Sequence, residues 1–140
     1  MRASLPKRGA GMLAVDTNII IRLLANDEPR QAEIARNFVE ANRTFVPKTV
    51  LLECEWVLRG TYQLQRAEIF DRLRAFAGLE TVEIEDSYAV EEALDLYSAG
   101  LDFADALHLQ SSVDCEAMVT FDRDFVKRAK RAGLSNVRQL

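Results

Sequence analysis

The segment MLAVDTNIIIRLL, residues 12–24, decides the class of fold. Its apolar run from Met12 to Val15 is typical of a buried strand. The polar residues Asp16, Thr17 and Asn18 follow at once, and all three residue types favour the start of a helix. We therefore expect a strand over 12–15 and a short helix from Asn18, although the β-branched run at 19–21 on its own fits either a helix or a strand.

The same alternation continues along the chain. Helical periodicity predicts helices over about 30–42, 49–58, 65–77, 86–98, 103–112 and 124–132. Short apolar or alternating runs predict strands over 44–47, 81–84, 117–120 and 136–138. Strands that alternate with helices indicate an α/β domain, so we predict one central parallel sheet of four to five strands with helices on both faces.

Length and composition indicate an ordinary globular protein. The chain has 140 residues, of which 49% are hydrophobic and 29% charged, which fits one domain and excludes a disordered or coiled-coil protein. We assign residues 1–11 to a basic N-terminal tail and residues 12–140 to the folded domain, with Met12 as an alternative translation start. Lacking an apolar stretch of roughly 20 residues, the sequence is expected to be cytoplasmic and not to contact a membrane.

Acidic residues fall where a parallel sheet would collect them. Asp16 follows the first predicted strand, and Asp122 comes two residues after the strand that ends at Thr120. In such sheets, ligands bind beyond the carboxyl ends of the strands. Asp105 lies in the first turn of the helix that Asp102 precedes. Each of these acids also fits a plain helix-capping role, and that alternative stays open.

The apolar helix over 49–58 carries a further acid, Glu53. Glu55 can pair with Arg59 four residues on, and we expect this pair to face water. Glu53 lacks such a partner and shares its face with Trp56 and Val57, which indicates the buried side. A buried, unpaired carboxylate is very costly unless it is neutralised or binds a metal, so we assign Glu53 a ligand role.

Carboxylates gathered at one sheet edge need a positive charge to offset their repulsion. Oxygen ligands suit Mg²⁺ or Mn²⁺, whereas the single His and the distant Cys54 and Cys115 cannot build a usual zinc site. A carboxylate-bound Mg²⁺ is the apparatus of phosphoryl transfer and of phosphodiester hydrolysis. The acids therefore indicate metal-dependent chemistry at a phosphate group.

A cluster of basic residues follows Asp122. The net charge of −4 and a pI near 5.1 argue against a non-specific binder of duplex DNA. The cluster is either a solvated helix face or a surface that contacts RNA phosphates. Its members are Arg123, Lys127, Arg128, Lys130 and Arg131.

Four pieces of this chain, in this order and spacing, resemble the PIN-domain ribonucleases, and most closely the VapC-type toxins of bacterial toxin–antitoxin pairs. These pieces are Val15-Asp16-Thr17-Asn18, Glu53 after Pro47, Asp102-Phe-Ala-Asp105-Ala-Leu-His108, and Val119-Thr120-Phe121-Asp122-Arg123-Asp124-Phe125. The resemblance maps the acidic quartet of that family onto Asp16, Glu53, Asp105 and Asp122.

The resemblance also implies roles for neighbouring residues. Asp102 and Asp124 would be auxiliary acids, and Thr17, Asn18 and Thr120 would orient the carboxylates by hydrogen bonds. We place Asp16, Asp105 and Asp122 nearest the metal, whereas His108 is expected to pack within its helix.

The implied activity is Mg²⁺- or Mn²⁺-dependent endonucleolytic cleavage of RNA by metal-activated water, in a homodimer whose site a VapB-like antitoxin covers. Three alternatives remain: a catalytically silent module that binds RNA or protein, a nuclease of RNA processing, and a receiver-like phospho-switch. The last is disfavoured because only one acid follows the first strand and a suitably placed lysine is missing.

Overall fold

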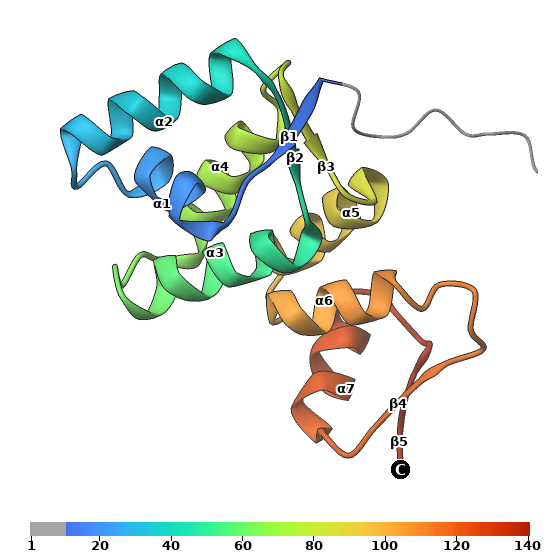
Figure 1. Cartoon of the computed structure of the whole chain (residues 1–140). Coiled ribbons are helices and arrows are strands. Elements are labelled where there is room, and N and C mark those ends of the chain that lie inside the picture. Colours follow the sequence, from blue (N-terminus) through green and yellow to red (C-terminus); the bar gives the residue numbers. More distant parts are fainter. Residues whose placement is uncertain (1–10) are drawn as a thin grey trace, which may run out of the picture.

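The computed structural model describes residues 11–140 (Figure 1). Apart from Gly11, the predicted N-terminal tail lies outside the described residues. The strands are β1 (Met12–Ala14), β2 (Arg43–Val46), β3 (Val82–Ile84), β4 (Met118–Thr120) and β5 (Val137–Gln139). The helices are α1 (Thr17–Ala25), α2 (Pro29–Ala41), α3 (Lys48–Gly60), α4 (Arg66–Ala77), α5 (Ser87–Ser98), α6 (Phe103–Gln110) and α7 (Arg123–Arg131).

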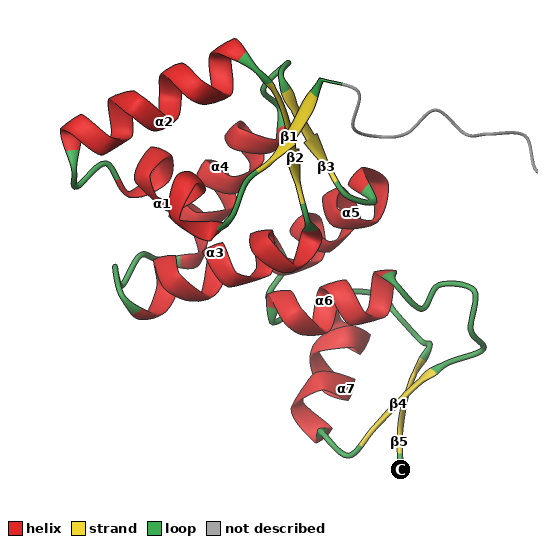
Figure 2. Ribbon diagram, in the orientation of Figure 1, coloured by secondary structure: helices red, strands yellow, loops and turns green. Residues whose placement is uncertain are grey.

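The α/β class and the parallel strands are confirmed, but the strands form two sheets in place of one. One sheet has the order β1-β2-β3, and the other consists of β4 and β5. Leu13 pairs with Thr44 in the first sheet, and Val119 pairs with Arg138 in the second. Figure 2 shows β4 and β5 apart from the other strands, beside α6 and α7.

Within residues 11–140, one cluster of buried apolar side chains joins the first sheet and its helices and continues to Phe125 and Ala129 of α7 and Val137 of β5. The β-branched run after Asn18 is helical, and Ile20 and Ile21 are buried in α1. Val46 of β2 and Leu51 of α3 are fully buried against the same core. Full burial of one such side chain contributes about 1.5–3 kcal/mol, so this core is the main source of stability. No helix within residues 11–140 has the length and apolar character needed to cross a bilayer.

The buried side chain of Glu55 links α3 to α5 by hydrogen bonds inside the core. It is 1% exposed, and Arg59 donates to its carboxylate at 2.9 Å. The Tyr97 hydroxyl of α5 donates to the same carboxylate oxygen at 3.0 Å. The predicted Glu55–Arg59 pair is thus present, but it does not face water as expected. The buried Tyr97 hydroxyl supplies the polar partner that makes burial of this carboxylate tolerable.

The turn from α5 to α6 positions the acidic residues that follow it. Gly100 has a φ of +117°, which favours glycine at this position. The Arg66 guanidinium of α4 donates to the carbonyl oxygens of Tyr97 and Leu101, each at 2.6 Å. It also lies over the Tyr97 ring, 4.5 Å from the centroid. These contacts fix the point at which α6 leaves the core.

Candidate active site

Asp16 lies directly beyond β1, at the start of α1. Although it occupies the N-cap position, its side chain makes no cap hydrogen bond, so the capping role does not explain this residue. The carboxylate is exposed, whereas the neighbouring Thr17 is buried at 8% exposure and Asn18 is exposed. Asp16 is therefore available to a ligand at the carboxyl end of its strand.

The predicted orientation of α3 is wrong. Glu53 is exposed and Glu55 is buried, the reverse of the expectation from the sequence. Leu51, Cys54 and Leu58 form the buried face together with Glu55. Since successive residues turn by about 100° around a helix, Glu53 then falls on the water side. The argument that burial forces Glu53 into a ligand role is thereby lost, but its carboxylate is open to a ligand.

Asp16 and Glu53 lie in one neighbourhood, around the thiol of Cys54. Burial, together with the nearby charges of Glu53 and Asp16, raises the pKa of the Cys54 thiol to about 12. Both carboxylates, one at the start of α1 and one on α3, therefore lie within electrostatic range of this buried thiol. These are two of the four acids that the sequence analysis selected.

Asp105 and Asp122 form a second neighbourhood. Burial raises the pKa of Asp105, and the charges of Asp102 and Asp122 add to that effect. The charges of His108 and Arg128 act in the opposite direction. His108 is exposed, which corrects the expectation that it packs within its helix. The remaining two acids of the predicted quartet thus lie near each other.

Asp102 and Asp122 both cap helices. The Asp105 N–H donates to Asp102 Oδ2 at 3.2 Å, and the Asp124 and Phe125 N–H groups donate to Asp122 Oδ1 at 2.9 and 3.1 Å. Because the second cap uses only Oδ1, Asp122 retains a further carboxylate oxygen for a ligand. Thr120 Oγ1 accepts the Asp122 N–H at 3.0 Å, so Thr120 orients the backbone that carries this acid.

A groove of about 530 Å³ runs between α3 and the start of α6. Glu53 lines it from α3, and Asp102 lines it from the cap of α6. The Arg59 guanidinium also lines the groove, and the charge of Asp102 contributes to its raised pKa. Of the four acids of the predicted quartet, Glu53 lines this groove, whereas Asp16, Asp105 and Asp122 do not.

The donor set fits a divalent metal ion in chemistry but not in arrangement. Carboxylate oxygens are the donors that Mg²⁺ and Mn²⁺ prefer. Within residues 11–140, however, no three His, Cys, Asp or Glu side chains come close enough together to hold a metal ion. The structure thus brings the predicted acids together in two pairs, Asp16 with Glu53 and Asp105 with Asp122, but not as a quartet.

The basic residues of α7 lie on the water side of that helix. All five residues of the predicted basic cluster are exposed, and Asp124 in the first turn is exposed as well. Phe125 and Ala129 form the buried face. The cluster members are Arg123, Lys127, Arg128, Lys130 and Arg131.

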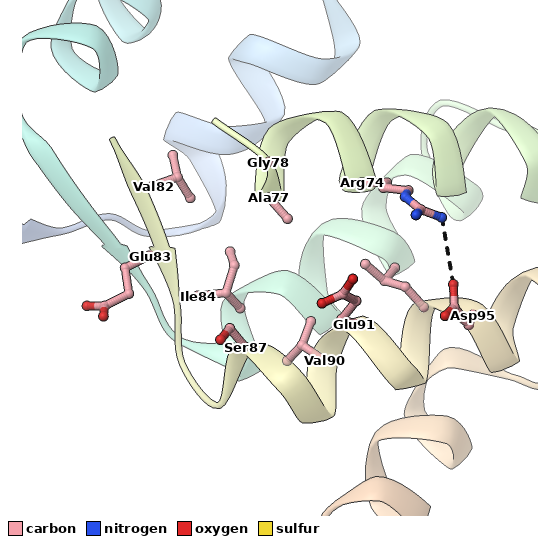
Figure 3. Close-up of a pocket in the computed structure, with 11 residues that line it drawn as sticks. Arg74, Ala77, Gly78, Val82, Glu83, Ile84, Ser87, Val90, Glu91 and Asp95 are labelled. Atoms are coloured by element: carbon pink, nitrogen blue, oxygen red, sulfur yellow. Dashed lines mark ion pairs between the residues drawn. The ribbon is translucent and has the colours of Figure 1, made fainter. Parts of the chain in front are cut away.

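A separate hollow of about 340 Å³ lies between α4, β3 and α5 (Figure 3). Its wall carries Glu83, Glu91 and an ion pair of 3.8 Å between Arg74 and Asp95. None of the acids selected from the sequence lines this hollow. The groove beside α3, which also holds the exposed Trp56, was not predicted from the sequence because Trp56 was assigned to the buried side.

An α/β domain with carboxylates at the ends of parallel strands is a class of fold that suits metal-assisted hydrolysis. Residues 13–131 match the PIN domain family, so this chain belongs to that family. It is 26% identical over 91 residues to a VapC ribonuclease of Aquifex aeolicus, an alignment that covers 62% of this chain and 67% of the relative.

Proposed function

We propose that this protein is a metal-dependent endoribonuclease of the VapC type, in which Asp16, Glu53, Asp105 and Asp122 form the active site with Mg²⁺ or Mn²⁺. The main support is the crowding of negative charge. Asp105 is half-buried, and two neighbouring carboxylates raise its pKa further. A carboxyl group whose pKa is raised by burial and by neighbouring acids is typical of functional sites. Family membership and the similarity to a VapC ribonuclease point to the same chemistry.

The proposed site requires the two pairs of acids to come together. Within residues 11–140, β1 pairs only with β2 and β4 pairs only with β5, so each sheet has an open parallel edge. Exposed apolar side chains lie on both strands, Leu13 at 47% and Val119 at 55% exposure. Parallel pairing of these two edges would satisfy the open backbone groups of β1 and β4, cover part of the exposed surface of Leu13 and Val119, and place Asp16 and Asp122 at one carboxyl edge. We propose that the catalytic state has this arrangement.

The residues of this chain have distinct parts in the proposed reaction. A divalent cation held by Asp16, Asp105 and Asp122 would polarise the scissile phosphate and lower the pKa of water, and Glu53 would orient the attacking water. Thr17, Asn18 and Thr120 orient the carboxylates, and Asp102 and Asp124 are auxiliary acids. The exposed basic cluster of α7 contacts RNA phosphates, which makes binding sensitive to salt.

The proposed biological setting follows the VapC relative. We propose a cytoplasmic toxin that acts as a homodimer and is restrained by a VapB-like antitoxin covering the acidic site. A nuclease of RNA processing would use the same residues. A gene for a small antitoxin beside the gene for this chain distinguishes the toxin from the processing enzyme.

The test is cleavage of total cellular RNA by the purified protein with Mg²⁺, with Mn²⁺ and with EDTA. We expect discrete fragments that require metal and that disappear in Asp16→Asn, while Glu83→Gln, which changes an exposed acid on β3, cleaves normally. Asp16→Asn should remain folded, because Asp16 is exposed and makes no cap hydrogen bond. Cleavage that persists in EDTA or in Asp16→Asn overturns the proposal. A folded protein that cleaves with neither metal supports the silent binding module, which the separation of the two acid pairs favours.

A further inference from the structure

Trp56 is the unusual residue of the groove beside α3. Its side chain is 65% exposed, although large aromatic side chains are mostly buried in folded proteins. It follows Glu53 by three residues, so the two side chains are neighbours on one face of the helix. Both line the groove that Asp102 borders from α6. A large, flat, apolar surface therefore lies beside acids of the proposed active site.

The core does not need this indole. The buried face of α3 consists of Leu51, Cys54, Glu55 and Leu58, and Trp56 points away from it. The neighbouring Arg59 is also about half exposed, and its guanidinium is held by Glu55 at 2.9 Å. Trp56 and Arg59 together present an aromatic plane and a fixed cation to the groove, without a structural reason for the exposure.

We propose that Trp56 is the platform on which an unpaired base of the RNA substrate stacks, next to the phosphate that is cleaved. This inference rests on the proposed function and names the side chain that positions one base of the substrate. The carboxylates of Glu53 and Asp102 repel phosphate wherever no cation lies between them, so the surface on the far side of these acids from the metal suits the uncharged part of a nucleotide. Bases stack on exposed aromatic rings and on arginine planes, and such stacking is available only to bases released from a duplex.

The composition of the groove favours a base over a protein surface as its occupant. The cores of protein interfaces are depleted of charged residues. The groove, in contrast, places the charged groups of Glu53, Asp102 and Arg59 around the indole and the smaller apolar side chains of Leu52 and Ala104. A flat base covers the indole alone and leaves those charged groups in water.

Trp56 is the only tryptophan of the chain, so its fluorescence reports directly on this site. The probe is a 12-residue single-stranded oligoribonucleotide with 2′-O-methyl riboses, titrated in Mg²⁺ and checked for integrity afterwards. We expect Trp56 fluorescence to be quenched along the same curve as the anisotropy of a labelled probe. Trp56→Ala should weaken binding on the order of 10-fold, whereas Trp56→Phe should retain most of the affinity. Tyr88→Ala, which removes an aromatic ring of 76% exposure on α5, is the matched control and should bind normally.

Three results overturn the inference. The first is a probe that binds without changing Trp56 fluorescence, and the second is the absence of probe binding. The third is Trp56 fluorescence that changes with protein concentration but not with the probe, together with a Trp56→Ala variant that is a monomer where the wild type is a dimer. That result would assign the indole to a protein interface. The inference and the proposed function fail separately. Cleavage by wild type with unchanged binding by Trp56→Ala refutes only the platform, whereas probe quenching without metal-dependent cleavage refutes only the nuclease.

Discussion

Replacement of Glu55 by alanine tests the orientation of α3 and the network that supports the α5–α6 turn. The Glu55 carboxylate is 1% exposed and accepts hydrogen bonds from Arg59 and from the Tyr97 hydroxyl. The Arg59 side chain is 51% exposed and can return to water, so its pairing contributes under about 1 kcal/mol. The hydrogen bond from Tyr97 to a charged, buried acceptor contributes about 1.5–3 kcal/mol, and its loss leaves a buried hydroxyl without an acceptor.

We therefore expect Glu55→Ala to lower the free energy of unfolding by about 3 kcal/mol, and Glu55→Gln, which keeps an acceptor for Tyr97, by about 1 kcal/mol. The assay is urea denaturation followed by circular dichroism, in metal-free buffer. Glu53→Ala on the exposed face of the same helix is the control and should change stability by less than about 0.5 kcal/mol. A large loss in Glu53→Ala with little change in Glu55→Ala would refute the orientation described above.

Further predictions concern charge, thiol reactivity and RNA binding. Burial and two neighbouring carboxylates raise the pKa of Asp105, so the folded state holds this proton more tightly than the unfolded chain does. Ionisation of Asp105 as the pH rises therefore lowers the stability of the folded state. Asp105→Asn should raise the midpoint of urea denaturation at pH 7 but not at pH 3, and an equal rise in the midpoint at both pH values would contradict this prediction. Ellman's reagent at pH 8 should label the exposed thiol of Cys115 quickly. The buried thiol of Cys54, whose pKa is about 12, should react only when the protein unfolds, so fast labelling of Cys54 in the folded Cys115→Ser variant would contradict this prediction. Removing two phosphate contacts with Lys127→Ala/Lys130→Ala should reduce the slope of log affinity for single-stranded RNA against log salt by about 1.4, and an unchanged slope would place the RNA elsewhere.

The sequence was a good guide wherever the determinants are local. Met12 to Asn18 predicted a strand followed by a helix, and β1 and α1 are found there. The caps formed by Asp102 and Asp122 were also among the roles that spacing suggested. Helix periodicity and capping depend on residues within a few positions, so one sequence contains enough information to predict them.

The failures all depend on contacts between distant residues. Glu55 is buried because Tyr97, 42 positions away, provides a hydrogen bond that no local pattern reveals. Because the sequence analysis assigned the wrong face of α3 to the core, it predicted Glu53 and Trp56 as buried and Glu55 as exposed. The parallel direction of the strands was also predictable from the sequence. Their division into two sheets depends on which strand edges pair, and short apolar runs do not specify that choice.

The central claim is that Asp16, Glu53, Asp105 and Asp122 act as one metal site despite belonging to two pairs in this structure. Isothermal titration with Mn²⁺ tests it directly, using wild type, the four single carboxamide variants and Glu83→Gln as the control acid. The account predicts that each of the four variants weakens Mn²⁺ binding by at least about 10-fold, and that Glu83→Gln binds as wild type does. Wild-type affinity in Asp122→Asn together with lost affinity in Asp16→Asn would show that the pairs are separate sites and would contradict the account.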